Sequence, residues 1–287
     1  PQGELMQPWQ DAENDAHNVD TITNLSLDFL ERNKGNPFFL FVSHNTIHDP
    51  LAERRKTIQK YEQLKETDEA ENHPVLAAMI ERLDKSCGRI FDKIIELGLE
   101  DNTIIFFYSD NGGLGKPRTN AEQNYPLRSG KGSLYEGGIR VPLMIKWPGI
   151  TNPGTVTDVP VTSTDFYPTF LDLLGFKGDE AHNNNLDGIS IAPVLKDPHG
   201  NLERQTLCWH HPHYYPDRKG PVSAIRKGNW KLLHYFEDNT LELYNLETDT
   251  GENNNLVASH PEKTKSLYKS LKKWRKEVNA RLPSQNG

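Results

Sequence analysis

The stretch IIFFYSDNGG, residues 104–113, predicts a buried strand that ends at a turn rich in polar side chains. A second stretch, GKGSLYEGGIRVP, follows at residues 130–142. In the first, the Asp110 carboxylate stands beside the Asn111 amide, and oxygen ligands of this kind suit a hard divalent cation. In the second, Lys131 lies between two glycines, which lets a tetrahedral anion approach its side chain. Together the two stretches predict an enzyme that handles sulfate or phosphate esters.

Each of these motifs also has an ordinary structural explanation when it is taken alone. Residues 109–113 have a composition that turns favour, and an isolated Gly-Lys-Gly is more often a solvated surface loop. The GxxxxGK[ST] spacing of a phosphate-binding P-loop is missing around Lys131. Two oxygen ligands also cannot satisfy Ca²⁺, which takes about 6–8 of them, so a calcium site here needs ligands from elsewhere.

Composition limits the possible partners. The 287 residues carry a net charge of −7 and no basic block before the C-terminal helix, which argues against nucleic acid as a partner. No apolar stretch approaches the ~20 residues that span a bilayer, and no signal-peptide pattern is visible at the N-terminus. The two cysteines, Cys87 and Cys208, belong to no CxxC pair, which argues against a zinc cluster; a disulfide between them stays open.

Hydrophobic spacing predicts the fold of the first two thirds of the chain. Helical spacing appears over residues 20–34 and 74–97, and continuous apolar runs at 38–42, 104–108 and 141–145 predict buried strands. This alternation is typical of an α/β fold with a mixed, mostly parallel sheet flanked by helices.

Two polar clusters directly follow predicted strands, at residues 44–49 and at Asp110-Asn111. Ligands gather at the carboxyl ends of the strands in such sheets, so we expect the clusters to meet. The first contains His48, whose imidazole can hold a sulfuryl oxygen or protonate a leaving group. A loop histidine taken alone is more often a plain hydrogen-bonding residue. Glu136 and Arg140, four residues apart, are candidates for a structural ion pair.

After about residue 198 the pattern changes to short strands separated by turn residues, followed by a helix over residues 261–281. We therefore expect two domains, residues 1–198 as an α/β part and residues 199–287 as a small antiparallel sheet plus helix. Within the second, His211 and His213 are candidates for substrate contact, with structural packing as the alternative. A zinc site there would lack a cysteine or acidic ligand within the loop.

Several long stretches resemble the successive motifs of type I sulfatases, within the alkaline phosphatase superfamily. They are FFLFVSHNTIHDP, DNTIIFFYSDNGG and GKGSLYEGGIRVPLMIKWPG, with VTSTDFYPTFLDLLG, LDGISIAPVL and SAIRKGNWKLLHY resembling the family's C-terminal portion. The resemblance implies an alkaline phosphatase-like fold with a small C-terminal subdomain. It also implies that Asp110 and Asn111 bind Ca²⁺, and that Lys131 and His48 contact the sulfate and assist departure of the leaving group.

The sequence departs from the family at the nucleophile. Sulfatases use a formylglycine made from the Cys or Ser of a C/S-x-P-x-R motif, and this sequence contains no such string, since Cys87 lies in KSCGR and Cys208 in TLCWH. The family's early paired aspartates, which complete the calcium site, are missing too. We therefore expect the C-terminal part of a sulfatase, inactive alone, whose formylglycine belongs to a missing N-terminal part. Such a part also leaves sheet edges and apolar surface exposed.

The resemblance implies a sulfated small molecule or glycan as the substrate and a periplasmic or secreted location; the oligomeric state stays open. Two alternatives remain. One is a phosphoric or phosphonic monoester hydrolase of the same superfamily. The other is a non-catalytic remnant that binds sulfated glycans.

Overall fold

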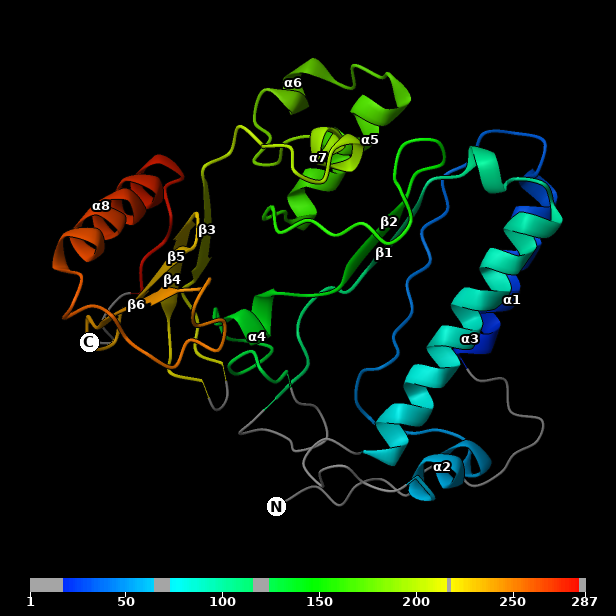
Figure 1. The fold of residues 1–287 in the computed structure, drawn as a ribbon, viewed down its shortest axis with the longest axis horizontal. Coiled ribbons are helices and arrows are strands. Elements are labelled where there is room, and N and C mark those ends of the chain that lie inside the picture. The colour runs from blue at the N-terminus through cyan, green and yellow to red at the C-terminus, as the bar shows by residue number, and fades with distance from the viewer. Residues whose placement is uncertain (1–17, 65–72, 116–123, 216–217, 284–287) are drawn as a thin grey trace. The chain divides into compact units, whose positions relative to one another are not determined.

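The computed structural model describes residues 18–64, 73–115, 124–215 and 218–283. Two compact units divide the chain: Pro1–Thr103 with Thr119–Gln123, and Ile104–Arg118 with Asn124–Gly287 (Figure 1). The boundary that we expect near residue 198 lies inside the second unit and stays a prediction. Among the helices of the described residues, none combines the length and apolar character that crossing a bilayer requires.

The first unit is built from helices, and its two long helices lie side by side (Figure 1). Its elements are α1 (Asn18–Asn33), α2 (Arg55–Glu62), α3 (Pro74–Glu96) and a short 3-10 turn (Glu100–Asn102). Helix α3 begins with Pro74 at its first turn, where the His73 ring nitrogen accepts the backbone N–H of Leu76 at 3.3 Å. Gly98 follows the helix with φ of +67°. The predicted helices are therefore confirmed.

The predicted buried strand at residues 38–42 is wrong. The structure assigns no strand there, and the side chains of Phe39 and Phe41 are 73% and 78% exposed. An apolar run becomes a buried strand only where neighbouring strands pair with it and other elements cover it. No strand of the described residues pairs with this run. The exposed phenylalanines instead agree with the expected exposure of apolar surface.

In the second unit, β1 (Ile105–Tyr108) pairs with β2 (Leu143–Lys146), and the pairing is antiparallel rather than parallel as the apolar runs predict. The reason lies in the connecting segment, which folds back on itself beyond the strands. The Ser109 N–H donates to the Pro142 carbonyl at 3.3 Å, and the Gly112 N–H donates to the Gly138 carbonyl at 3.2 Å. Through these bonds the segment after β1 runs antiparallel to the segment before β2, as far as the short helix α4 (Glu136–Ile139).

Helix α5 packs against this strand pair through aromatic side chains. The Phe106 ring lies 5.5 Å from the Phe166 ring and 5.0 Å from the Phe170 ring, between centroids. The helices of this region are α5 (Phe166–Leu174), α6 (Glu180–Asn183) and α7 (Ala192–Lys196), with a 3-10 turn (Ser163–Asp165) before them. The buried Asp165 pairs with Arg204 and so ties this region to the start of the next sheet.

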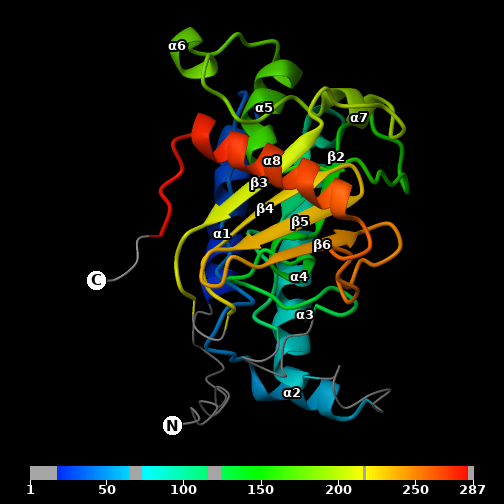
Figure 2. The same ribbon diagram turned by 90° about the vertical axis from the view of Figure 1, so that its left-hand side faces the viewer.

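The predicted C-terminal sheet and helix are confirmed. Strands β3 (Thr206–His211), β4 (Val222–Lys227), β5 (Trp230–Tyr235) and β6 (Leu241–Asn245) form an antiparallel sheet in chain order. Helix α8 (Pro261–Glu277) lies across one face (Figure 2), where Leu267 and Leu271 pack with Leu232. A second core cluster joins Leu134 and Tyr135 to residues of this sheet.

Both cysteines are free thiols and half-buried. Cys87 lies on α3 of the first unit and Cys208 on β3 of the second. Burial raises the pKa of the Cys208 thiol to about 12, so this thiol stays protonated at neutral pH and is a poor nucleophile.

Candidate functional site

Two loops of the second unit carry candidate residues and are bonded directly to each other. We name them the Asp110 loop (residues 109–115) and the Lys131 loop (residues 128–135). The backbone N–H of Lys131 donates to the carbonyl of Gly113 at 2.9 Å. The Asn124 amide donates to the same carbonyl at 3.0 Å and to the Ser129 carbonyl at 2.9 Å. The structure therefore brings together the two motifs that the sequence separates by about twenty residues.

The two glycines around Lys131 are required by packing. A Cβ on Gly130 would lie 2.2 Å from the Gly113 carbonyl oxygen. Gly132 has φ of +87°, and a Cβ there would lie 2.4 Å from the ring of Tyr215. The absence of a Cβ at Gly130 and Gly132 thus lets the Lys131 loop pack closely between the Asp110 loop and Tyr215. The sequence alone does not show that the two glycines serve this packing.

Asp110 and Asn111 follow β1, as predicted, and their side-chain oxygens suit a hard cation. Within the described residues the exposed Asp110 carboxylate makes no hydrogen bond or ion pair. The Asn111 amide nitrogen donates to the Gly112 carbonyl at 3.0 Å, which leaves its side-chain oxygen as the acceptor. No group of three or more His, Cys, Asp or Glu placed to hold a metal occurs in the described ranges. The pair therefore fits Ca²⁺ as a partial set of ligands.

A buried ion cluster fixes the end of the Lys131 loop to the C-terminal sheet. The ammonium of Lys231, on β5, lies 2.8 Å from the Glu136 carboxylate and 2.9 Å from that of Glu252. Glu252 also accepts the backbone N–H of Glu136 at 2.6 Å. Burial raises the pKa of the Glu252 carboxyl. Glu136 thus pairs with Lys231, and the sequence-based pairing with Arg140 is wrong because Glu136 points into the core while Arg140 is exposed.

Aromatic side chains also attach the Lys131 loop to the C-terminal sheet. The Arg128 guanidinium lies 4.1 Å from the centroid of the Tyr135 ring and donates to the Tyr244 hydroxyl at 3.0 Å. The Tyr135 hydroxyl in turn donates to the Glu242 carboxylate at 2.6 Å. Burial raises the pKa of Tyr135 well above its usual value, so this hydroxyl remains a donor.

His48 lies in the first unit, in an exposed loop with defined internal bonds. Its Nδ1 lies 2.9 Å from the Asp49 carbonyl, which makes Nδ1 the protonated nitrogen, and its backbone N–H donates to the Asn45 carbonyl at 3.1 Å. The loop is held to α3 where His44 Nε2 lies 3.0 Å from the Ser86 hydroxyl. Convergence of His48 with Lys131 involves both units and stays a prediction.

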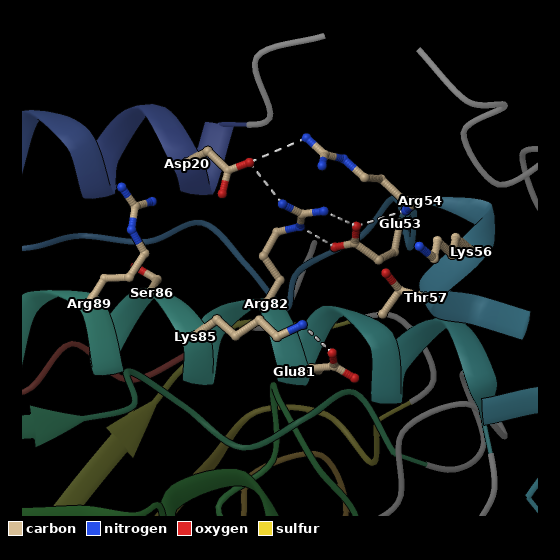
Figure 3. A pocket seen from close by; sticks show the side chains of 10 residues that line it. All are labelled: Asp20, Glu53, Arg54, Lys56, Thr57, Glu81, Arg82, Lys85, Ser86 and Arg89. Carbon is tan, nitrogen blue, oxygen red and sulfur yellow. Dashed lines mark hydrogen bonds and ion pairs between the residues drawn. The ribbon is translucent and has the colours of Figure 1, made fainter. Parts of the chain in front are cut away.

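A hollow of about 440 Å³ lies over the helices of the first unit, and ion pairs join several of the charged residues that line it (Figure 3). Arg82 on α3 pairs with the buried Glu53 and, at 2.9 Å, with Asp20 on α1. Asp20 thus lies in the first turn of α1 as an ion-pair partner of Arg82. We interpret the Glu53–Arg82 pair as an anchor for the segment that follows His48.

The predicted substrate residues His211 and His213 lie beside each other after β3, with ring centroids 5.7 Å apart. Within the described part of the chain, neither makes a hydrogen bond through its ring. Burial and the neighbouring His213 lower the pKa of His211, so this ring is neutral at pH 7. The adjacent His210 is structural, since its ring bonds to the Ser223 hydroxyl and to the Arg281 carbonyl, each at 2.7 Å.

Sequence reasoning missed the side chains that hold the loops. Asn124, which bonds both loops, stands in no recognisable motif. Lys231 gave one signal, because it interrupts the apolar β5 sequence WKLLHY where a buried charge requires a partner. The partners Glu136 and Glu252 are far from it in sequence, so only the fold identifies them.

Comparison with known proteins identifies the family of this chain. The family model described as Sulfatase matches residues 4–176, and the model described as N-sulphoglucosamine sulphohydrolase, C-terminal, matches residues 129–280. A protein named Sulfatase from Formosa agariphila is 34% identical over 271 residues, which cover 88% of this chain and 48% of that relative. Arylsulfatase A from Homo sapiens is 30% identical over 258 residues, which cover 82% of this chain and 47% of that relative.

A solved structure gives the same result for the fold. The crystal structure of Ps i-CgsB in complex with k-i-k-neocarrahexaose has a TM-score of 0.76 and 28% identity, and covers 92% of this chain and 56% of that chain. The chain thus spans about half the length of the relatives that it matches. Since the sulfatase model alone matches more than half of its residues, the chain belongs to the sulfatase family, whose members are hydrolases of the alkaline phosphatase-like fold.

Proposed function

We propose that this chain is part of a sulfatase that hydrolyses the sulfate esters of a carbohydrate, with Ca²⁺ as its metal and a formylglycine nucleophile outside this chain. The observation that carries the proposal is the direct bonding of the Asp110 loop to the Lys131 loop. It supports the proposal because the loop of Asp110 and Asn111, whose side-chain oxygens suit a hard cation, is hydrogen-bonded to the loop of Lys131, whose ammonium suits a tetrahedral anion.

In this proposal Asp110 and Asn111 would be among the ligands of the calcium, which would supply positive charge that stabilises the sulfate group. The Lys131 ammonium adds a second positive charge, which stabilises the charge that develops on the oxygens in the transition state. His48 contacts the sulfate and assists departure of the alcohol. His211 and His213, with ring nitrogens not bonded within the described residues, contact the sugar.

Support for the substrate class comes from the similar structure of Ps i-CgsB in complex with k-i-k-neocarrahexaose. A periplasmic or secreted location rests on family resemblance alone. We also propose that the chain is inactive by itself, because it lacks the C/S-x-P-x-R string. The competing readings are phosphoric or phosphonic ester hydrolysis, and glycan binding without turnover.

The test compares this chain with the protein at its full natural length. Initial rates are measured with 4-nitrophenyl sulfate and 4-nitrophenyl phosphate, with Ca²⁺ and after chelation. We expect Ca²⁺-dependent sulfate release from the natural-length protein, a large but measurable decrease in the Lys131→Ala variant, and no turnover by this chain. A preference for the phosphate ester would favour the first competing reading. Binding of sulfated oligosaccharides without release of sulfate would favour the second.

A further inference from the structure

The guanidinium of Arg218 bridges both candidate loops. Its Nε donates to the carbonyl oxygen of Lys131 at 3.0 Å, and one terminal nitrogen donates to the carbonyl of Leu114 at 2.5 Å. Leu114 belongs to the Asp110 loop, and Arg218 lies between β3 and β4. The connection between β3 and β4 thus supplies one side chain that bonds the main chain of Lys131 and that of the Asp110 loop.

We infer that Arg218 is a positioning residue for the proposed sulfate-ester reaction, and that it acts by fixing the main chain of Lys131 relative to the Asp110 loop. The inference rests on the proposed function for the roles of Lys131 and Asp110. Arg218 belongs to no motif of the sequence. If it positions Lys131, the segment between β3 and β4 contributes to the candidate site.

Bonding two backbone carbonyls with one side chain suits an arginine better than a lysine. A guanidinium is planar and rigid and carries donors that point in fixed directions, so one group can bond two carbonyls at once and hold them at a set spacing. An ammonium keeps the positive charge but presents a single nitrogen on a flexible stem. A Lys at position 218 therefore separates the effect of charge from the effect of the bridge.

Tyr215 supports the same arrangement from the same segment. Its ring covers Gly132, which directly follows Lys131. The Lys131 loop is consequently fixed by Arg218 at the Lys131 carbonyl, by Tyr215 at the next residue, and by Gly113 at the Lys131 amide. A catalytic ammonium needs such definition because displacement by about 1 Å costs on the order of a hundredfold in rate.

The first test is a double-mutant cycle in the natural-length protein with 4-nitrophenyl sulfate. We expect Arg218→Gln to lower kcat by tenfold to a hundredfold, on the order given by such a displacement, and Arg218→Lys to recover only a minor part. In a Lys131→Met background the same Arg218→Gln change should alter kcat by less than about twofold, because its effect passes through Lys131. Arg55→Gln, which removes an exposed arginine of α2, is the charge control.

An equal loss in both backgrounds, or full activity of Arg218→Lys, overturns the inference. A second measurement does not depend on turnover: hydrogen exchange of this chain. Arg218→Gln should speed exchange of the amides in residues 112–115 and 130–133 and leave β5 unchanged. Unchanged exchange in both loops overturns the positioning role. A wild-type protein that releases no sulfate refutes the proposed function instead, and the exchange result still decides whether Arg218 holds the loops.

Discussion

The ammonium of Lys231 lies 2.8 Å from the Glu136 carboxylate with no part of the lysine side chain exposed. Glu252, also fully buried, is the second partner, so one cation is shared between two acids. Through Glu136 this cluster connects the EGG segment after the Lys131 loop to the centre of the C-terminal sheet. The family's long motif thus serves the packing of the loop as well as its chemistry.

Lys231→Met should destabilise the chain by about 3–5 kcal/mol, because it removes the ion-pair partner of the buried Glu252 and leaves the buried Glu136 with Arg226 at 3.9 Å alone. Chemical denaturation gives the free energy of unfolding. Lys273→Met is the matched control, because Lys273 on α8 is 77% exposed and its loss should change stability by no more than about 0.5 kcal/mol. Equal effects of the two substitutions would remove the argument that the cluster holds the loop.

Gly132→Ala should destabilise the chain through two causes. The added methyl overlaps the Tyr215 ring, and a φ of +87° disfavours any residue with a Cβ. We expect a loss of about 2–4 kcal/mol, from overpacking and backbone strain together. Gly149→Ala isolates the strain, because Gly149 has φ of +74° and open space around its Cβ position. Thermal unfolding of both variants checks the order, which a smaller effect at Gly132 would contradict.

Acid should weaken the first unit through Glu81. Hydrogen bonds from Lys60, Lys85 and Tyr61 lower the pKa of the Glu81 carboxyl to about 2. Since the folded pKa lies below the unfolded value of about 4.3, the stabilisation is complete above that value and is lost as the pH falls through about 2.

Unfolding free energies measured at several pH values between about 5 and 2 test this linkage. Wild type should lose more stability over this range than Glu81→Gln, which has no carboxylate to protonate. Glu262→Gln on α8 serves as the control for removal of one acid and should follow wild type. Parallel curves for wild type and Glu81→Gln would show that the ion pairs contribute nothing.

Much of this fold follows from sequence patterns that are local. Helical spacing and turn residues predict α1, α3 and α8 and the strands of the C-terminal sheet, because each buries one face of a regular period. The run at 38–42 carries an equally strong pattern, yet Phe39 and Phe41 are exposed. Burial of a strand depends on partners, and a pattern within five residues cannot say whether those partners are present.

The candidate site likewise contains residues that the sequence predicts and residues that only the fold identifies. The sequence predicts Asp110, Asn111 and Lys131 from residue chemistry, and the structure brings their loops together. The side chains that create this contact, Asn124 and Arg218, act through backbone carbonyls, and any residue type offers a carbonyl. Their roles therefore leave no pattern in sequence and become visible only in the fold.

His211 and His213 should contribute to substrate binding rather than to the chemical step. In the natural-length protein, replacing both by Ala should raise KM for a sulfated oligosaccharide by roughly tenfold, the equivalent of one or two lost hydrogen bonds. KM for 4-nitrophenyl sulfate should stay within about twofold, because the aryl ester has no sugar to contact. His199→Ala, at an exposed turn, is the control. An unchanged oligosaccharide KM would assign these rings to packing.

The most direct test of the central claim is a crystal structure of the natural-length protein with Ca²⁺ and sulfate. The account predicts one tetrahedral anion within hydrogen-bonding distance of both the Lys131 ammonium and the His48 ring, beside a cation bound by Asp110 and Asn111. Placement of His48 more than about 10 Å from Lys131, well beyond any hydrogen bond, would contradict it. So would a cation held elsewhere.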